Sequence, residues 1–496
     1  MPTTLNVTAL AVFLAFFALV TVIGFLASRW KSGDLNELHE WGLGGRQFGT
    51  LITWFLVGGD FYTAYTVIAV PALVYAVGAY GFFALPYTII VYPFVFMVMP
   101  RLWKACHRGN HITAADYVQG EYGGKWFAAA IAVTGIVATM PYIALQLIGM
   151  QVVIKSMGVS GEIPLTVAFL ILAFYTYASG IRAPAMIAFV KDIMIYIVVI
   201  VAVCMIPSKL GGYASVFDAA GSVFAQKGGA TGLTLQPTQI FAYASLALGS
   251  ALAAFMYPHT MTAILSSSSE KTIKKNAILL PAYSLLLGLI ALMGYMAIAA
   301  GVKVSNNTEV VPALFAQLFP SWFIGFAAAA IAISALVPAA IMSIGAANLF
   351  TRNLWKPLVN PNITPKQESQ NAKLISLVVK FGALIFIVVL PTKFAIDLQL
   401  LGGVWILQTL PAIVVTLYTR RMKLPALFIG WLVGIVLGTS LVFMQGLKPI
   451  YALSIGGQSY PIYIGLIALA CNLLIASVLS FLLQLRAKPV ALAAGR

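Results

Sequence analysis

Long apolar stretches, which follow one another along nearly the whole chain, constrain the fold of this sequence more than any other feature. A helix that crosses the hydrocarbon core of a membrane needs roughly 20 mostly apolar residues. Thirteen stretches meet this requirement, at residues 8–28, 49–79, 82–103, 126–156, 164–180, 183–207, 237–264, 277–301, 321–349, 373–391, 395–418, 425–445 and 461–485. Since 61% of the 496 residues are hydrophobic and 8% are charged, too few polar residues remain to cover a soluble globule of this size. We therefore predict an all-α polytopic membrane protein, with residues 1–496 forming a single membrane domain.

The lysines and arginines predict how the chain is oriented, because these residues collect in cytoplasmic loops. With the N-terminus outside the cell, 21 of the 29 lysines and arginines fall in cytoplasmic loops or the C-terminal tail, and six fall in the opposite loops. The other two, Lys191 and Lys380, lie within apolar stretches. We therefore expect the N-terminus outside and the C-terminus inside. The net charge of +16 then needs no nucleic-acid partner.

The second stretch contains an interruption that is unusual for a membrane helix. Its sequence TWFLVGGDFYTAYTVIAVPALVY, residues 53–75, places Gly58 and Gly59 directly before Asp60. Glycine leaves helical geometry readily, and an ionisable residue within the membrane usually faces a water-filled path or a partner. An unwound turn at this depth is tolerated where it is buried in protein or lines a cavity. The pattern predicts a broken helix that forms an ion or substrate site; close packing at the glycines, with a structural role for Asp60, is the alternative.

The seventh stretch carries a second interruption. Its sequence IFAYASLALGSALAAFMYPHTMTAIL has Gly249 and Ser250 at its middle, and Tyr257, Pro258 and His259 lower down. Transporters built from inverted repeats place broken helices at corresponding positions of their two halves. We expect this stretch to break near Gly249 and Ser250, and the two broken helices to pack against each other. His259 is interpreted as a structural residue beside a cytoplasmic loop.

Several segments resemble motifs of the sodium:solute symporter family. Three of them, which occur in the order that the family shows, are SGIRAPAMIAFVKDIMIY at 179–196, YPHTMTAILSSSSEKTIKKN at 257–276 and ISALVPAAIMSIGAANLFTRNLW at 333–355. Within the family, LVGGDFYTAYTVIAVPALVY and LQLLGGVWILQTLPAIVV, the latter at 398–415, are similar to the bacterial monocarboxylate permease branch. The resemblance implies a multi-pass protein of the bacterial inner membrane that is not an enzyme and binds no cofactor other than a coupling ion.

The resemblance also implies the leucine-transporter-like fold, in which two inverted repeats of five helices give alternating access to a central site. On this sequence the repeats would be residues 49–207 and 237–418, which hold stretches 2–6 and 7–11. The helix at 8–28 and the helices within 425–485 would be additions at the two ends. The implied function is secondary active symport.

A sodium site between the second and ninth stretches follows from the same resemblance. Carbonyl donors would come from the turn around Asp60, as either Gly58 with Phe61 or Gly59 with Tyr62. The ninth stretch would add a carbonyl and a hydroxyl from two residues three positions apart, which share one face of a helix. Sodium is a hard cation, and about five or six oxygens of this kind suit it. The resulting assignment of sodium ligands is Gly59, Tyr62, Ala340 and Ser343.

One position departs from the family's pattern. The family commonly has a second hydroxyl directly after the serine of the ninth stretch, and here that residue is Ile344. The site loses one oxygen ligand, and Asp60 becomes a candidate proton carrier. Sodium is the expected coupling ion, and a proton carried by Asp60 is the alternative.

The expected substrate is a small monocarboxylate of the acetate, propionate, pyruvate or lactate class, bound among stretches 2, 4, 7 and 11. The side chains with hydrogen-bonding groups at suitable places are Tyr62, Thr63, Tyr65, Tyr142, Gln146, Trp405 and Gln408. Free backbone N–H groups after Gly59, at the start of a half-helix, would hold the carboxylate. For each of these side chains, packing between helices is the alternative to ligand contact.

Other functions remain as alternatives. A sodium symporter for another small solute, such as an amino acid, has the same features, and so does a channel or a receptor on the same fold. A membrane aspartyl protease needs two apposed carboxylates, which Asp60 and Asp192 offer. However, Val57 stands where the GxGD pattern of such proteases has glycine. Asp192 is expected instead to form a buried ion pair with Lys191. Neither a nucleic acid nor an obligatory protein partner is expected; the partners are the substrate and the lipid bilayer.

Overall fold

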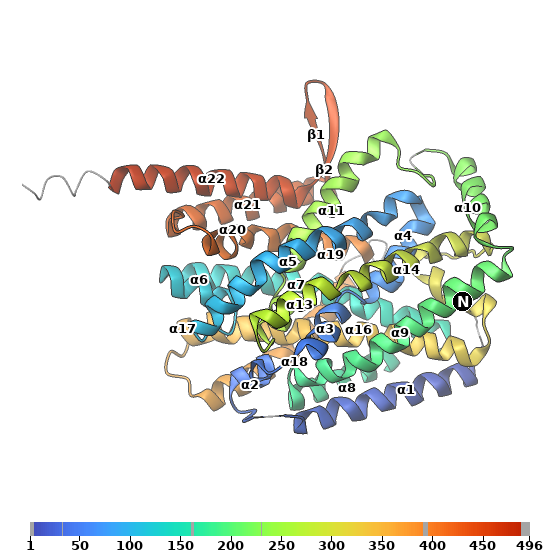
Figure 1. Ribbon diagram of the computed structural model, residues 1–496, viewed down its shortest axis with the longest axis horizontal. Coiled ribbons are helices and arrows are strands. Elements are labelled where there is room, and N and C mark those ends of the chain that lie inside the picture. Colours follow the sequence, from blue (N-terminus) through green and yellow to red (C-terminus); the bar gives the residue numbers. More distant parts are fainter. Residues whose placement is uncertain (1–3, 32, 160–162, 230, 390–394, 488–496) are drawn as a thin grey trace, which may run out of the picture.

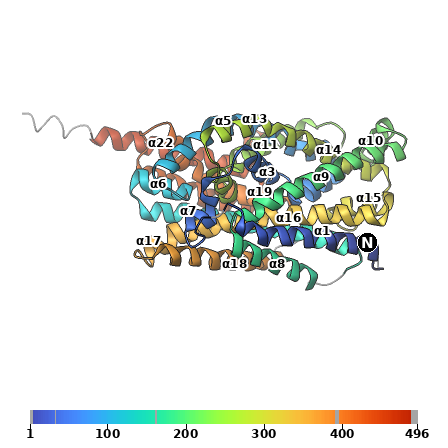
Figure 2. The same cartoon turned by 60° about the horizontal axis from the view of Figure 1, so that its bottom comes forward.

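The chain folds into a bundle of long helices that run roughly parallel to the long axis of the molecule (Figures 1 and 2). The computed structural model describes residues 4–31, 33–159, 163–229, 231–389 and 395–487. Side chains are not described for Tyr65, 384–389, 395–396 and 487. Within the described residues, the regular structure is helical apart from one two-stranded antiparallel sheet. The predicted all-α membrane architecture is confirmed.

The helices follow the apolar stretches closely. The first half of the chain forms α1 (Val7–Leu26), α2 (Leu38–Leu43), α3 (Thr50–Gly59), α4 (Val70–Val77), α5 (Ala84–Arg108), α6 (Ala114–Tyr122), α7 (Lys125–Ser156), α8 (Ile163–Ser179), α9 (Arg182–Lys209) and α10 (Tyr213–Lys227). The second half forms α11 (Ile240–Ala254), α12 (Pro258–Leu265), α13 (Glu270–Leu279), α14 (Pro281–Ala299), α15 (Val310–Leu318), α16 (Ser321–Leu349), α17 (Lys356–Leu358), α18 (Pro365–Val389), α19 (Ala395–Ile406), α20 (Leu410–Ile413), α21 (Leu424–Met444) and α22 (Ile464–Ala487). The hairpin consists of β1 (Ile450–Ile455) and β2 (Gln458–Tyr463), and π-helical turns occur at Tyr65–Ala69 and Phe350–Trp355.

Each of the thirteen apolar stretches coincides with one or more helices, but the helices differ in length. Within the described part of the chain, nine helices are long and apolar enough to cross a membrane, and ten if α11 and α12 count as one bent span. The remaining stretches correspond to the interrupted α3–α4, the 17-residue α8 and the more polar α18. α1 begins and α22 ends at opposite ends of the bundle (Figures 1 and 2). Thirteen crossings and an outside N-terminus stay predictions.

α16 forms the centre of the bundle. In the most apolar 18-residue segment of α16, 94% of the residues are buried. The helix packs against α1, α7, α9, α12 and α18. Small residues allow these close approaches: a Cβ at Gly345 would lie 2.8 Å from the carbonyl carbon of Pro258 at the start of α12. Without a hydrophobic drive between helices in lipid, such close packing is a main source of helix association. The small residues of the ninth stretch therefore place α16 directly behind the second break.

The outer layer consists of helices whose side chains remain largely uncovered. In the most apolar 18-residue segments of α1, α21 and α22, 28% of the residues are buried. α21 and α22 pack mainly against each other at one edge of the bundle (Figure 1). β1 and β2 pair from Ile450 with Tyr463 to Ile455 with Gln458, and turn at Gly456 and Gly457, both with positive φ. The sequence analysis did not predict this hairpin. It leads into α22, which makes the last helix begin at Ile464.

Candidate functional site at the two helix breaks

The break predicted in the second stretch is present. α3 ends at Gly59, residues 60–63 form a non-helical turn, and helical structure resumes at Ala64. The backbone N–H of Ala64 donates to Oε1 of Gln146 on α7 (3.0 Å), and Nε2 of Gln146 donates to the carbonyl of Tyr142 (3.3 Å). The first N–H groups of a helix have no partners within it, so the Gln146 amide caps the restarted helix. Gln146, predicted as a substrate ligand, is thus engaged with backbone, and it occupies one of the N–H groups expected to hold the carboxylate.

The two glycines before the turn permit two different close contacts. A Cβ at Gly58 would lie 2.5 Å from Cζ of the Tyr283 ring on α14. A Cβ at Gly59 would lie 2.9 Å from Nζ of Lys191 and 3.0 Å from Oδ2 of Asp192, both on α9. A side chain at either position would therefore displace these buried groups. The glycines combine the packing role and the unwinding that the sequence analysis treated as alternatives.

The second break lies closer to the C-terminal end of the seventh stretch than predicted. α11 continues through Gly249 and Ser250 to Ala254, and α12 starts at Pro258, with an angle of 48° between the two helices. Proline has no N–H to donate, so the carbonyl of Ala254 loses its helical partner. The hydroxyl of Thr260 donates to that carbonyl instead (2.7 Å). The sequence signal for this break was Pro258.

Gly249 and Ser250 serve packing rather than unwinding. A Cβ at Gly249 would contact the Tyr463 ring at the end of β2 and would lie 3.3 Å from Cγ of Leu466 on α22. The missing side chain therefore lets α11 lie close to the hairpin and the last helix. The prediction of a break at Gly249–Ser250 was wrong, because a glycine within a helix can equally mark a close helix contact.

The two breaks face each other in the centre of the bundle. The rings of Phe61 and Phe255, one from each break, lie 6.2 Å apart between centroids. Oδ2 of Asp60 lies 3.3 Å from Nε2 of His259, the second residue of α12, and both side chains are buried. The expectation that the broken helices pack against each other is confirmed. His259, interpreted from sequence as a structural residue near a loop, is instead the partner of Asp60.

Two polar atoms at this junction lack a protein partner. Among the described residues, neither Oδ1 of Asp60 nor Nδ1 of His259 has a hydrogen bond. A buried donor or acceptor without a partner costs about 1–3 kcal/mol, so native proteins keep few of them. Such atoms cluster where a ligand or water completes the hydrogen bonding. The space between the breaks is therefore the candidate binding site.

Tyr142 covers this space from α7. Its ring lies 5.4 Å from the His259 ring and 5.5 Å from the Tyr257 ring, centroid to centroid. Its hydroxyl is hydrogen-bonded to the side chain of Thr63 in the first break. Tyr142 and Thr63, both predicted from sequence, thus come together beside Asp60 and His259.

The other predicted substrate residues of the second stretch differ in position. The hydroxyl of Tyr62 donates to the carbonyl of Tyr283 (3.0 Å), and the two rings lie 4.7 Å apart, so this side chain faces α14. The side chain of Tyr65 lies outside the described residues. Of the predicted substrate residues in this stretch whose side chains are described, Tyr62 and Thr63, it is Thr63 that lies at the junction.

Trp405 and Gln408 turn toward the outer helices. Nε1 of Trp405 donates to the Thr439 hydroxyl on α21 (3.1 Å). The amide of Gln408 is buried and bonds to the carbonyl of Val404 (2.9 Å) and to Nδ2 of Asn472 on α22 (3.2 Å). The structure therefore separates these two side chains from the junction. An apolar helix gives no sequence signal for which face points inward, and the hydrogen-bonding groups here hold α21 and α22.

The turn directs its carbonyls at a lysine. Nζ of Lys191 on α9 donates to the carbonyls of Gly59 and Tyr62, the latter at 3.3 Å. The same Nζ lies 2.9 Å from Oδ1 of Asp192, and both side chains are fully buried. The predicted Lys191–Asp192 ion pair is present, and it lies against the turn rather than apart from it.

The second pair of turn carbonyls is used locally. The carbonyl of Gly58 accepts from the N–H of Phe61 (2.9 Å), and the carbonyl of Phe61 accepts from the Thr66 hydroxyl. Of the two pairs left open by the sequence, Gly59 with Tyr62 is therefore the pair that converges on one cation.

Ala340 and Ser343 lie in the buried middle of α16, as predicted. The Ser343 hydroxyl donates to the Ala340 carbonyl (2.7 Å). Among the described residues, neither of them is hydrogen-bonded to Lys191. Ile344, which replaces the family's second hydroxyl, is also fully buried. Of the oxygens assigned to sodium, the carbonyls of Gly59 and Tyr62 accept from the Lys191 ammonium, and the Ser343 hydroxyl donates to the Ala340 carbonyl.

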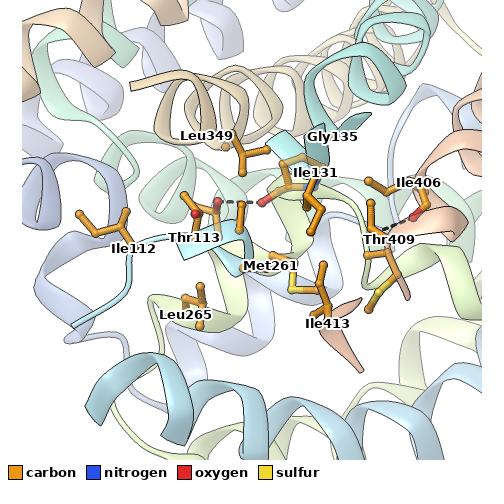
Figure 3. A pocket seen from close by; sticks show the side chains of 16 residues that line it. Ile112, Thr113, Ile131, Gly135, Met261, Leu265, Leu349, Ile406, Thr409 and Ile413 are labelled. Carbon is orange, nitrogen blue, oxygen red and sulfur yellow. Dashed lines mark hydrogen bonds between the residues drawn. The ribbon is translucent and has the colours of Figure 1, made fainter. Parts of the chain in front are cut away.

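Cavities lie on either side of the second break. One of about 30 Å³ touches Met256 and α12, and is lined mostly by apolar side chains (Figure 3). Its polar wall includes Thr409, whose hydroxyl donates to the Ile406 carbonyl (2.7 Å; Figure 3). The other, of about 410 Å³, touches Leu246 on α11 and is lined by Asp397 and Lys448. The two cavities thus lie near different parts of the α11–α12 pair.

Two ionisable residues at the first break were missed as site residues by sequence reasoning. His259 follows Pro258, so the proline that ends α11 was the available signal for its central position. Lys191 lies within an apolar stretch, where an ionisable residue is costly and marks a functional position. Its contact with the Gly59 turn depends on the packing of α9 against α3, which no local pattern indicates.

Comparisons with known proteins show relatives that match nearly the whole chain. The family model of the sodium:solute symporter family matches residues 41–434. The "Monocarboxylate transport permease protein" of Rhizobium johnstonii is 63% identical over 488 residues, which are 98% of this chain and 99% of that protein. The "Uncharacterized symporter YodF" of Bacillus subtilis is 33% identical over 453 residues, 90% of each chain.

A solved structure shares the fold. The chain of "Substrate-bound outward-open state of a Na+-coupled sialic acid symporter reveals a novel Na+-site" superposes with a TM-score of 0.77, at 16% sequence identity. The alignment covers 96% of this chain and 98% of that one. The predicted leucine-transporter-like fold is thereby confirmed.

Proposed function

Since the chain belongs to the sodium:solute symporter family, we propose that it is a secondary active symporter that takes up a small monocarboxylate together with a cation. The observation that carries the substrate class is the 63% identity, over nearly the full length of both chains, with a protein named monocarboxylate transport permease. The substrates that we expect are acetate, propionate, pyruvate and lactate.

The junction of the two breaks suits such a ligand. The hydroxyls of Tyr142 and Thr63 are neutral hydrogen-bonding groups beside the two unpartnered atoms of Asp60 and His259. Aromatic rings from both breaks, including Phe61 and Phe255, provide apolar walls for a short alkyl chain. Oδ2 of Asp60 faces Nε2 of His259 at 3.3 Å, which leaves Oδ1 of Asp60 and Nδ1 of His259 for a ligand or a water molecule.

The identity of the coupled cation is a separate question from the substrate class. Membership in a sodium:solute symporter family, and the fold of a sodium-coupled symporter, favour sodium for the family as a whole. In this chain, the choice of ion depends on what the carbonyls of the Gly59 turn bind.

Counterflow in proteoliposomes tests the substrate class without depending on any ion gradient. Vesicles loaded with unlabelled pyruvate should accumulate external labelled pyruvate transiently. Unlabelled acetate, propionate and lactate at millimolar concentration should reduce the signal, while proline and glucose should leave it unchanged. Displacement by proline alone, with the four monocarboxylates inert, would show an amino-acid symporter instead.

A further inference from the structure

The ammonium of Lys191 contacts three protein oxygens at the first break, two through hydrogen bonds and one through an ion pair. An ammonium has three N–H donors, and here it faces three oxygens: the carbonyls of Gly59 and Tyr62 and Oδ1 of Asp192. The side chains of Lys191 and Asp192 are both 0% exposed. The positive charge is thus held by protein oxygens alone.

These acceptors include the two carbonyls that the family resemblance assigns to sodium. Both ions are monovalent cations that seek oxygen lone pairs, so ammonium and sodium compete for the same two carbonyls. A second cation beside a buried ammonium would meet like-charge repulsion in a medium of low dielectric constant. The remaining assigned oxygens, on Ala340 and Ser343, are hydrogen-bonded to each other.

The surrounding residues hold the lysine in place. The hydroxyl of Tyr283 on α14 donates to Oδ2 of Asp192 (2.8 Å), which fixes the carboxylate that balances the ammonium. Gly59 leaves room for Nζ, since a Cβ there would lie 2.9 Å from it. The site is therefore built from the α3 turn, α9 and α14 together.

The other ionisable groups around this lysine are few. Asp60, in the turn, interacts with Lys191 electrostatically and is itself paired with His259 of α12. The rings of Tyr62 and Tyr196 pack against Tyr283, with centroids 4.7 and 6.0 Å from it. Within the described neighbourhood, the Lys191 ammonium is balanced by the Asp192 carboxylate, with which it pairs at 2.9 Å, while Asp60 faces His259.

We propose that the Lys191 ammonium is a tethered cation that takes the place of sodium at the first break, so that uptake by this chain does not require sodium. The inference rests on the proposed function for its substrate. It departs from the sodium coupling that the family name suggests, on the ground of the occupied carbonyls.

The first test compares the sodium dependence of uptake with counterflow in the same wild-type proteoliposomes. Net uptake of labelled pyruvate should be unchanged when external sodium is replaced by choline. If counterflow works but net uptake needs sodium, the inference is overturned while the proposed function stands. If counterflow with every monocarboxylate fails, the proposed function is wrong.

The second test uses thermal unfolding in detergent, which does not depend on transport. Wild-type protein should have the same Tm in sodium chloride and choline chloride. Lys191→Ala vacates the two carbonyls beside the Asp192 carboxylate, and its Tm should rise with sodium concentration, because a ligand that binds only the folded state stabilises it. Lys380→Ala is the matched control: Lys380 is also fully buried, but it bonds to the Ser376 carbonyl on α18 (3.3 Å), and its removal should create no response to sodium.

A wild-type Tm that rises with sodium as steeply as that of Lys191→Ala would overturn the inference, since the carbonyls would then accept sodium with the lysine present. The same conclusion would follow if Lys191→Ala folds and shows no response to sodium. If Lys191→Ala does not fold, the two wild-type comparisons decide: equal uptake and equal Tm in sodium and choline support the tethered cation, and a sodium effect on either overturns it.

Discussion

Gly58, Gly59 and Asp60 each make a different contact at the first break. Gly58 lets α3 approach the Tyr283 ring, Gly59 lets the turn approach Lys191, and Asp60 reaches His259 across the junction. The missing side chains of the two glycines and the carboxyl group of Asp60 are therefore all needed for the contacts at this break. At this scale, function depends on distances that one added carbon would change.

Gly59→Ala tests this close approach. The new Cβ would lie 2.9 Å from Lys191 Nζ and force the ion pair to shift. Overpacking of this kind costs about 1–3 kcal/mol, so we expect a lower Tm and loss of uptake. Gly49→Ala is the control, because a Cβ at Gly49 meets nothing within 4 Å; equal effects of the two substitutions would refute the contact.

The Asp60–His259 contact predicts energetic coupling between the two breaks. Asp60→Asn and His259→Gln each leave a buried partner behind, so each should destabilise the protein. The double variant should lose less than the sum of the two, by about 0.5–3 kcal/mol, as for other contacting pairs. Unfolding of the four proteins in detergent measures the coupling, and strict additivity would show that the two side chains do not interact.

The breaks arise by different means at the scale of elements. α3 ends where two glycines precede a charged turn, and the Gln146 amide restarts the helix by capping Ala64. α11 ends because Pro258 offers no N–H, and the Thr260 hydroxyl satisfies the freed carbonyl of Ala254. Each unwound segment is thus stabilised by one polar side chain that replaces a lost backbone bond.

Thr260→Val tests this replacement, since valine keeps the shape of threonine but removes the hydroxyl. The Ala254 carbonyl would remain buried without its side-chain donor, at a cost of about 1–3 kcal/mol. Thr260→Ser keeps the hydroxyl and should retain most of the wild-type Tm. A valine variant as stable as the serine variant would mean that water or another group satisfies the carbonyl.

At the scale of the whole molecule, α16 is the buried centre, and α1, α21 and α22 form parts of its outer surface. The junction lies between α11 and α12 on one side and α3 on the other, with hollows of about 410 and 30 Å³ beyond the second break. The orientation in the membrane decides which hollow faces the cytoplasm.

Cysteine labelling tests the predicted orientation. After replacement of Cys106, Cys204 and Cys471, a cysteine at the exposed Leu5 should react with a membrane-impermeant maleimide in intact cells. A cysteine at Tyr418, also exposed, should react only after the cells are opened. The reverse pattern would invert the topology derived from the basic residues.

The sequence predicted the fold well because its signals are collective. The apolar stretches involve many positions along the chain, so single exceptions matter little. The first break was also predictable, since Gly58, Gly59 and Asp60 violate the membrane-helix pattern together. Gly249 shows the limit of such reasoning: a lone glycine marks either a break or a close contact, and here it serves contact with Tyr463.

The site was predicted less completely, because its contacts join distant segments. Thr63 and Tyr142 come together at the junction, whereas Trp405 and Gln408 bind the outer helices. The pairing of His259 with Asp60, and of Lys191 with the Gly59 turn, depends on how separate helices pack. Neither hydropathy nor spacing contains that information in a helix that is apolar on all sides.

The location of the substrate between the two breaks is tested most directly by the KM for pyruvate counterflow in Tyr142→Phe and Trp405→Phe. Loss of the Tyr142 hydroxyl should raise the KM roughly five- to 150-fold, which corresponds to the cost of about 1–3 kcal/mol for a buried polar group left without its partner. Trp405→Phe keeps an aromatic ring and loses only the bond to Thr439, so its KM should match the wild type. A raised KM in Trp405→Phe with an unchanged KM in Tyr142→Phe would contradict a binding site at the junction.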